Sequence, residues 1–297
     1  MSFAPRNIDH VVLASRSLSG EVELYRRLGF QVGVRNRHPF GTENHIIQFD
    51  GSFLELISAG QGFIRPPDSV KFRFSFPVFV FDYLKRREGM AMLALGTRDA
   101  VADRAEFIKN GIGEFETFHF ERRARRPDGS EAMVAFTLAY AQSKLMTDAG
   151  FFTCQQHYPA SFWNPCFQDH PNGATGLSGV VMVAENPADH AEFLSHLTDQ
   201  REMHSTSLGI ELSLAGGQKL EVLTEAGYSF RYGQPAPESA AASFAAVRIK
   251  VRDLETARRV MLEGAIAAIE RPGMLIVPQE IADGVMLVFE KDENSAA

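Results

Sequence analysis

The sequence has few cysteines, no excess of basic residues and no long apolar run. Two cysteines among 297 residues fit a reducing compartment, so we expect a cytoplasmic protein. A formal net charge of −7 argues against a nucleic-acid-binding surface, which would need a basic excess. No apolar run is long enough to span a bilayer, and the start "MSFAPRNIDHVVLA" has no charged leader followed by an apolar core. We therefore expect neither membrane residence nor export.

One cluster of basic residues stands out against this acidic background. It comprises Arg122, Arg123, Arg125 and Arg126 in "ERRARRPDGSE" and lies beside a turn signal. We interpret it as a solvated hairpin tip, with a clamp for an anionic substrate as the alternative.

The chain contains an internal repeat, which the length already suggests because 297 residues favour two ordinary domains or one duplicated domain. An apolar strand over residues 8–14 precedes a helix whose apolar stripe includes Val22, Tyr25 and Leu28, closed by Gly29. Three short strands follow, over residues 30–35, 45–49 and 53–58, the last two joined by the turn Asp50-Gly51. This order is one βαβββ unit.

The same order recurs three more times. Units begin near residues 90, 177 and 244, and their final turns include Gly216-Gly217 and Asp283-Gly284. Aligning the turns lays "GSFLEL" over "GQKLEV", so Glu55 and Glu221 each follow the turn glycine by four residues. We therefore predict an α+β fold of four βαβββ modules in two paired-module domains, residues 5–160 and 177–292, joined by a connector over residues 161–176.

The modules and the blocks "IDHVVLASRSL", "GTENHIIQFDGSFLELI" and "HPNGA" resemble the vicinal oxygen chelate superfamily, and within it the glyoxalase-like domain proteins. The resemblance implies cupped sheets around a divalent metal such as Zn, Fe, Mn or Ni. The metal would chelate neighbouring oxygens of a small substrate and stabilise an enolate or oxyanion. It also implies that the ligands come from the first and fourth strands of each module, and it is compatible with a homodimer.

Carried over position by position, the resemblance gives the first module His10 and Glu55, which match the ligand types of the superfamily. The other modules offer Met92 and Cys154, Gly179 and Glu221, and Ala246 and Val288. The second half thus keeps only Glu221, for which a partly exposed or arginine-paired carboxylate is the favoured interpretation. Ring-cleaving dioxygenases need two histidines and a carboxylate, typically from the second half of a four-module chain, so this activity is disfavoured.

The segment "FFTCQQHYPASFWNPCFQDHPNGA" holds both cysteines and the only tryptophan. The pairs Cys154/His157 and Cys166/His170 have the residue types of a structural zinc site but not a zinc-finger spacing, and packing is the favoured interpretation. Because Cys154 would be on a fourth strand, we predict His157 as a third metal ligand beside His10 and Glu55.

Other residues are predicted to contact a substrate. These are Asn44, His45, Cys154, Gln156 and Trp163. His10 and Glu55 are also the predicted catalytic residues, because a carboxylate flanked by the apolar residues of "FLELI" needs a partner or a raised pKa.

Two functions follow from this sequence. The first is a metal-dependent glyoxalase-like enzyme with lyase or isomerase chemistry on a small oxygen-rich substrate. The second is a metal-free protein that binds or sequesters a small molecule, for which the 24 phenylalanines would provide an apolar cup. Metal content distinguishes the two.

Overall fold

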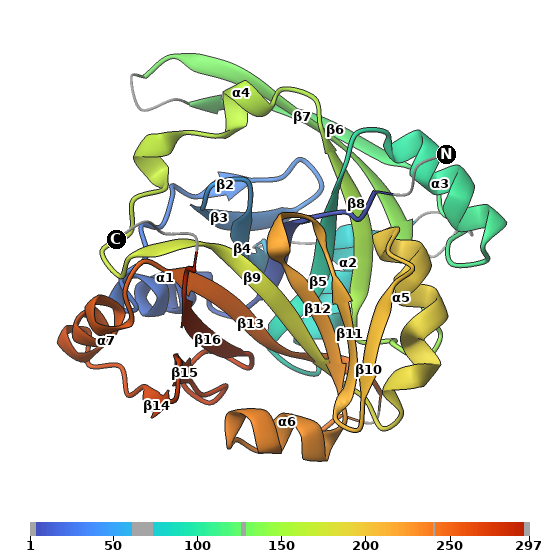
Figure 1. Ribbon diagram of the computed structural model, residues 1–297. Helices are drawn as coiled ribbons and strands as arrows, with labels where there is room; N and C mark the ends of the chain where they lie inside the picture. Colours follow the sequence, from blue (N-terminus) through green and yellow to red (C-terminus); the bar gives the residue numbers. More distant parts are fainter. Residues whose placement is uncertain (1–3, 61–73, 126–128, 240, 294–297) are drawn as a thin grey trace.

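The protein forms two eight-stranded mixed sheets, one from each half of the chain (Figure 1). A computed structural model describes residues 4–60, 74–125, 129–239 and 241–293. The first sheet has the strand order β2-β3-β4-β1-β5-β8-β7-β6, and the second has the order β10-β11-β12-β9-β13-β16-β15-β14. The two orders are identical once eight is subtracted from the second set of labels, as expected of a duplicated architecture.

The bounds of the elements are as follows. In the first half they are β1 Ile8–Ala14, α1 Leu18–Arg27, β2 Asn36–Arg37, β3 Thr42–Gln48, β4 Phe53–Ala59, α2 Phe76–Leu84, β5 Gly89–Thr97, α3 Ala100–Lys109, β6 Phe118–Arg125, β7 Glu131–Ala141, β8 Gly150–Gln156 and α4 Pro159–Phe162. In the second half they are η1 Pro165–Phe167, β9 Ala174–Val183, η2 Pro187–His190, α5 Ala191–Thr198, β10 Met203–Thr206, β11 Gly209–Ser213, η3 Ala215–Gly217, β12 Lys219–Leu223, α6 Glu225–Tyr232, β13 Ser243–Val251, α7 Leu254–Glu263, β14 Ile269–Arg271, β15 Met274–Val277 and β16 Met286–Lys291.

The four βαβββ modules predicted from the repeat are confirmed. Each module pairs its first strand with its fourth in parallel, as β1 does with β4 and β9 with β12. The two modules of each sheet join where β1 runs antiparallel to β5 and β9 antiparallel to β13. The second strand of the first module was predicted at residues 30–35, but the ladder includes only Asn36 and Arg37.

Local sequence explains where the module helices begin. Ser17 caps α1 by accepting a hydrogen bond from the backbone N–H of Gly20, and Asp99 and Asp253 cap α3 and α7 in the same way. Side-chain oxygens at these positions satisfy N–H groups that have no partner inside the helix. In these three modules the cap lies two or three residues after the end of the first strand.

The first sheet curls until its two edges meet. The ring of Phe40, which follows β2, packs against Phe118 and Phe120 on β6, with centroids 5.2 and 5.4 Å apart. His38 also reaches Phe120, at 5.8 Å. Because β2 and β6 are opposite edges of this sheet, these aromatic contacts close it around an interior, which we call the N-terminal cup.

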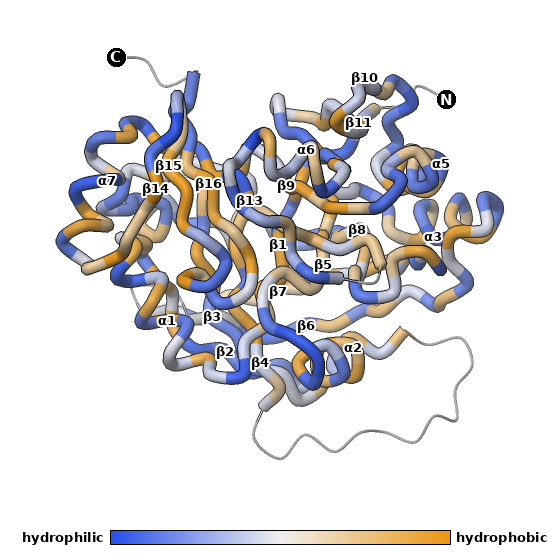
Figure 2. Tube along the Cα trace, turned by 90° about the horizontal axis from the view of Figure 1, so that it is seen from below, coloured by the Kyte–Doolittle hydropathy of each residue, from blue (hydrophilic) through white to orange (hydrophobic). Residues whose placement is uncertain are grey.

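The hydrophobic core has three parts. The largest includes residues of both sheets and of helices α1, α5 and α7, and it joins the two halves. A second fills the N-terminal cup, and a third fills the corresponding interior of the second sheet, which we call the C-terminal cup. Figure 2 shows hydrophobic stretches along strands in the middle of the molecule, including β9 and β16.

Two helices outside the repeat help to fill the cups. Helix α2 packs Phe76, Val80 and Tyr83 into the N-terminal cup, and α6 packs Tyr228 and Tyr232 into the C-terminal cup. The repeat pattern did not predict either helix. Within the described part of the chain, no helix combines the length and apolarity that crossing a membrane requires.

Candidate functional site

A cavity of about 50 Å³ lies inside the N-terminal cup. Its apolar wall is mostly aromatic and includes seven phenylalanines, namely Phe40, Phe53, Phe76, Phe120, Phe136, Phe152 and Phe162. Its polar lining consists of His10, His38, Asn44, Glu55, Arg122 and Cys154. A small number of polar groups in an apolar hollow is the usual character of a small-molecule site.

His10 is held in one orientation by its neighbour Asp9. The pairing of β1 with β5 changes register between Ile8 and His10, and His10 Nδ1 lies 2.6 Å from Asp9 Oδ1. Because a carboxylate only accepts, Nδ1 carries a hydrogen, and in the neutral imidazole Nε2 then presents a lone pair. The imidazole also stacks on Phe53 at 4.2 Å. The Nε2 lone pair of His10 therefore has a fixed direction.

The Nε2 atom of His10 lies near the carboxylate of Glu55. Glu55 is buried on β4, and its Oε2 lies 3.9 Å from His10 Nε2. Its Oε1 lies 3.8 Å from His38 Nε2, and it accepts a hydrogen bond from the Asn44 amide. The predicted convergence of His10 and Glu55 is thus present in the geometry, with Glu55 between two imidazoles.

His38 is a site residue that the sequence reasoning missed. The hairpin between β2 and β3 turns at Gly41, whose φ is 100°, and brings His38 beside Thr42 and Asn44. Asn44 Nδ2 lies 3.3 Å from His38 Nε2, and His38 Nδ1 lies 2.8 Å from Thr42 Oγ1. Since the amide N–H donates, His38 Nε2 is also a lone pair. The signal was "HPFGT", a tight turn flanked by polar residues.

Burial keeps His38 uncharged. Removal from water is the main cause that lowers the pKa of His38, and the charges of Arg122 and His10 act in the same direction, whereas Glu55 opposes them. The Nε2 lone pair of this neutral imidazole accepts a hydrogen bond from the Asn44 amide.

Cys154 lies close to His10 and Asp9. Its thiol, Asp9 and His10 form a group whose ligand atoms all lie within 4.8 Å of one another. Burial is the main cause that raises the pKa of Cys154 well above its usual value, and the charge of Asp9 adds to it. Asp9 also accepts a hydrogen bond from Gln156 Nε2 at 2.8 Å. The thiol is therefore protonated, and Asp9 is surrounded by donors.

The remaining predicted residues lie outside the cavity lining. His45 points to the other face of β3, where its Nδ1 contacts the carbonyl of Gly33 at 2.7 Å. Gln156 donates a hydrogen bond to Asp9. Trp163 packs on Phe162, with ring centroids 4.9 Å apart. His157 is exposed beyond the end of β8 and bonds to Thr137 Oγ1 at 2.7 Å.

The two cysteine–histidine pairs of the 151–174 segment do not come together as one site. Cys166 is exposed, and both ring nitrogens of His170 have backbone partners, the N–H of Gln31 and the carbonyl of Gln48. Among the described residues, Asp9, His10 and Cys154 form the single compact group of this kind. The segment contributes packing and one thiol to the cup.

The basic cluster divides between two environments. Arg122 lines the cavity, whereas Arg123 is exposed and pairs with Glu131 at 3.1 Å. The side chain of Arg125 and all of Arg126 lie outside the described residues.

Strand register gives the equivalent positions in the other modules. In the first module, Glu55 on β4 pairs with Val12 on β1. In the second module, Ala94 on β5 is the equivalent of Val12, and it pairs with Phe152 on β8. The alignment that placed Cys154 at this position was therefore wrong by two residues, which kept it on the same face of the strand.

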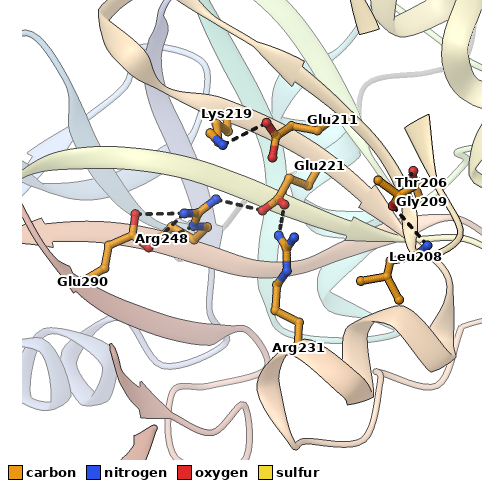
Figure 3. Close-up of polar contacts among 9 residues, drawn as sticks. All are labelled: Thr206, Leu208, Gly209, Glu211, Lys219, Glu221, Arg231, Arg248 and Glu290. Carbon is orange, nitrogen blue, oxygen red and sulfur yellow. Dashed lines mark hydrogen bonds and ion pairs between the residues drawn. The ribbon is translucent and has the colours of Figure 1, made fainter. Parts of the chain in front are cut away.

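In the third module Glu221, paired with Val181, is the equivalent of Glu55. Its negative charge is neutralised by arginines of the protein and is not available to a metal ion. Its carboxylate contacts Arg231 from α6 and lies 2.8 Å from Arg248 Nη1, and Arg248 also binds Glu290 (Figure 3). Glu221 was predicted to be partly exposed or paired with an arginine; it is buried and paired with two arginines.

Comparisons with known proteins agree on family and fold. A family model described as a glyoxalase-like domain matches residues 8–198. No curated protein sequence matches the chain. Similar solved structures include a hypothetical protein from Staphylococcus aureus, with a TM-score of 0.65 and 12% identity over 96% of this chain and 99% of that one.

Two further structures show the same fold. A triple mutant of 4-hydroxymandelate synthase from Streptomyces coelicolor gives a TM-score of 0.60 and 14% identity, over 99% of this chain and 94% of that one. A xylose isomerase-like TIM barrel/4-hydroxyphenylpyruvate dioxygenase fusion protein gives 0.54 and 10%, over 100% of this chain and 50% of that one.

Proposed function

The chain belongs to the glyoxalase-like domain family of the vicinal oxygen chelate superfamily, and we propose that its N-terminal cup binds a divalent metal ion and acts on a small oxygen-bearing compound. The observation that carries the proposal is the position of Glu55 between two imidazole nitrogens, 3.9 and 3.8 Å away. Lyase or isomerase chemistry in a cytoplasmic protein is the form that the family resemblance favours.

The atoms that surround Glu55 have lone pairs that could bind a cation. His10 Nε2, His38 Nε2 and the two carboxylate oxygens are all acceptors, because both Nδ1 hydrogens are used by Asp9 and Thr42. The Asn44 amide is the one hydrogen-bond donor that contacts this group within the described residues, and its Oδ1 is buried without a partner. Such an excess of buried lone pairs is costly unless a cation balances it.

Separations also support this assignment. Metal bonds to nitrogen and oxygen are about 2.0–2.2 Å long for zinc, so two ligands of one ion are at most roughly 4.0–4.4 Å apart. The His10–Glu55 and His38–Glu55 separations of 3.9 and 3.8 Å lie just inside this limit. We assign His10 and Glu55 as ligands. His38 does not form one compact group with both of them among the described residues, so we assign it no ligand role, and the predicted third ligand, His157, is exposed outside the cavity lining.

We assign the group of Asp9, His10 and Cys154 a supporting role. In it, Asp9 already accepts from His10 and Gln156, so its oxygens are not left without partners. A carboxylate that holds the far nitrogen of a metal-bound histidine is a common feature of metal sites. Asp9 thereby fixes the tautomer and direction of His10.

When bound, the metal would act as a Lewis acid that stabilises negative charge on a substrate oxygen. The chain itself supplies the surroundings of that step. The phenylalanines of the cavity exclude water and strengthen every charge interaction inside it. His38, neutral and facing the cavity, is placed to accept a proton at Nε2 from a bound compound.

A metal-free binding protein is the second candidate, because the seven cavity phenylalanines form an apolar hollow whether or not a metal is present. Elemental analysis of the purified protein, prepared without chelator, separates the two. We expect about one divalent ion per chain in the unchanged protein, and less than a tenth of that in His10→Ala. His45→Ala is the matched control, because His45 is on the outer face of the neighbouring strand.

An unchanged metal content in His10→Ala would refute the assignment of ligands. A metal-free wild-type protein that takes up no zinc, iron, manganese or nickel on dialysis would favour the binding protein instead.

A further inference from the structure

Arg122 is a cation inside an otherwise aromatic cavity. It projects from β6, where the inward-facing residues alternate as Phe118, Phe120 and Arg122 and meet the β2 hairpin. Arg122 lines the cavity together with Glu55 and His38. Within the described part of the chain, no hydrogen bond or ion pair of Arg122 is present, although a guanidinium offers five N–H donors.

The environment of Arg122 is costly for a charge. Burial is the main cause that lowers the pKa of Arg122, and only the charge of Glu55 opposes it. The neighbouring Arg123 has none of this cost, since it is exposed and paired with Glu131. A half-buried guanidinium that lines a cavity and has no partner among the described residues indicates that the partner comes with the ligand.

The C-terminal cup shows the contrasting arrangement. There the glutamate equivalent to Glu55 is in direct contact with two arginines, Arg231 and Arg248, and the charges cancel within the protein (Figure 3). In the N-terminal cup, Arg122 interacts with Glu55 through space but forms no such ion pair among the described residues. Arg122 and Glu55 are therefore both available to bind a ligand or a metal ion.

We propose that Arg122 binds the carboxylate of a small monocarboxylic acid and so determines which compounds enter the N-terminal cup. A planar guanidinium matches a carboxylate with two parallel hydrogen bonds. The cavity of about 50 Å³ favours an acid of a few carbon atoms, with its apolar part against the phenylalanines. This inference rests on the proposed function, since it places the ligand in the same cup, with its reacting end toward His10 and Glu55.

The test compares acids with their neutral amides, which have nearly the same shape. Acetate, propionate and lactate are titrated beside acetamide, propionamide and lactamide by calorimetry, with inorganic phosphate as a further anion. In the unchanged protein we expect at least one acid to bind at least tenfold more tightly than its amide. Arg122→Met, which keeps an apolar stem, should reduce this preference to less than threefold. Arg123→Gln is the matched control and should retain it.

Repeating the titrations after removal of metal with EDTA separates this inference from the proposed function. A preference for acids that depends on Arg122 with or without metal supports the inference, even if the metal proposal fails. The inference is overturned if no acid of the panel binds, if acids and amides bind equally, if phosphate binds more tightly than every acid, or if the preference survives in Arg122→Met. Circular dichroism and the thermal midpoint verify that each variant is folded.

Discussion

Replacing glutamate by glutamine at Glu55 and at Glu221 should have opposite consequences, although the two residues occupy equivalent positions on β4 and β12. The carboxylate of Glu221 is 1% exposed and contacts two arginines. Removing its charge leaves Arg231 and Arg248 partly buried with a neutral amide. Breaking a buried ion pair from one side typically costs about 3–5 kcal/mol.

We expect a smaller loss at Glu221, for two structural reasons. The side chains of Arg231 and Arg248 are 34% and 17% exposed, so water compensates part of the loss. Arg248 also retains Glu290 at 2.9 Å. The free energy of unfolding should therefore fall by about 2–3 kcal/mol in Glu221→Gln. At roughly 2–3 °C per kcal/mol for a protein of this size, the thermal midpoint should fall by about 4–9 °C.

At Glu55 the same change removes a charge that has no arginine in contact with it among the described residues. The new amide keeps an oxygen for Asn44 and adds N–H groups that can donate to the lone pairs of His10 and His38. In the presence of EDTA, the free energy of unfolding of Glu55→Gln should be unchanged or raised by up to about 1 kcal/mol. Without chelator, the variant should lose the stabilisation that bound metal gives to the unchanged protein.

The assay is thermal unfolding followed by circular dichroism, for both variants and the unchanged protein, with and without EDTA. The reasoning is refuted if the two variants lose the same stability in EDTA, or if Glu55→Gln is the less stable of the two.

Three further predictions test other parts of the molecule. Glu21 on α1 is buried with its Oε2 unpartnered, and burial, assisted by the charges of Asp283 and Glu88, raises its pKa well above 4.5. Its protonated form is therefore favoured in the folded state, so its contribution to stability is present below pH 4.5 and is lost as the pH rises through the folded-state pKa. Glu21→Gln should be more stable than the unchanged protein at pH 8 but not at pH 4, as measured by urea unfolding; equal effects at both would contradict this. The thiols should differ in reactivity, since Cys154 is buried with a raised pKa and Cys166 is exposed. A thiol-specific chromogenic reagent should titrate one thiol quickly in the native protein and the second only after denaturation, and two fast thiols would be the contrary result. Asp9→Asn should weaken metal binding about 10–100-fold, as is typical when the group that orients a ligand is changed, and competition with a metal-sensitive dye would detect no change if Asp9 only packs.

The sequence by itself determined the modular fold, for a local reason. Strand and helix order, the turns at Gly51 and Gly217 and the equivalent caps Ser17 and Asp99 are encoded within short stretches and repeated along the chain. The resemblance to the vicinal oxygen chelate superfamily also implied that His10 and Glu55 project into the same cup. The cost of burying a carboxylate predicted that Glu221 would be either partly exposed or paired with an arginine.

Only the tertiary structure decided which other side chains complete the site. His38 and Arg122 are 84 positions apart in the sequence and become neighbours because the first sheet curls until its edge strands touch. The side of β3 that faces inward, which carries Asn44 rather than His45, depends on its pairing with β4, and a shift of one residue would reverse it. His157 was predicted from its place near the end of a strand, but the position at which β8 ends leaves it exposed beside Thr137. Closure and register are properties of the whole sheet, and no short stretch of sequence contains them.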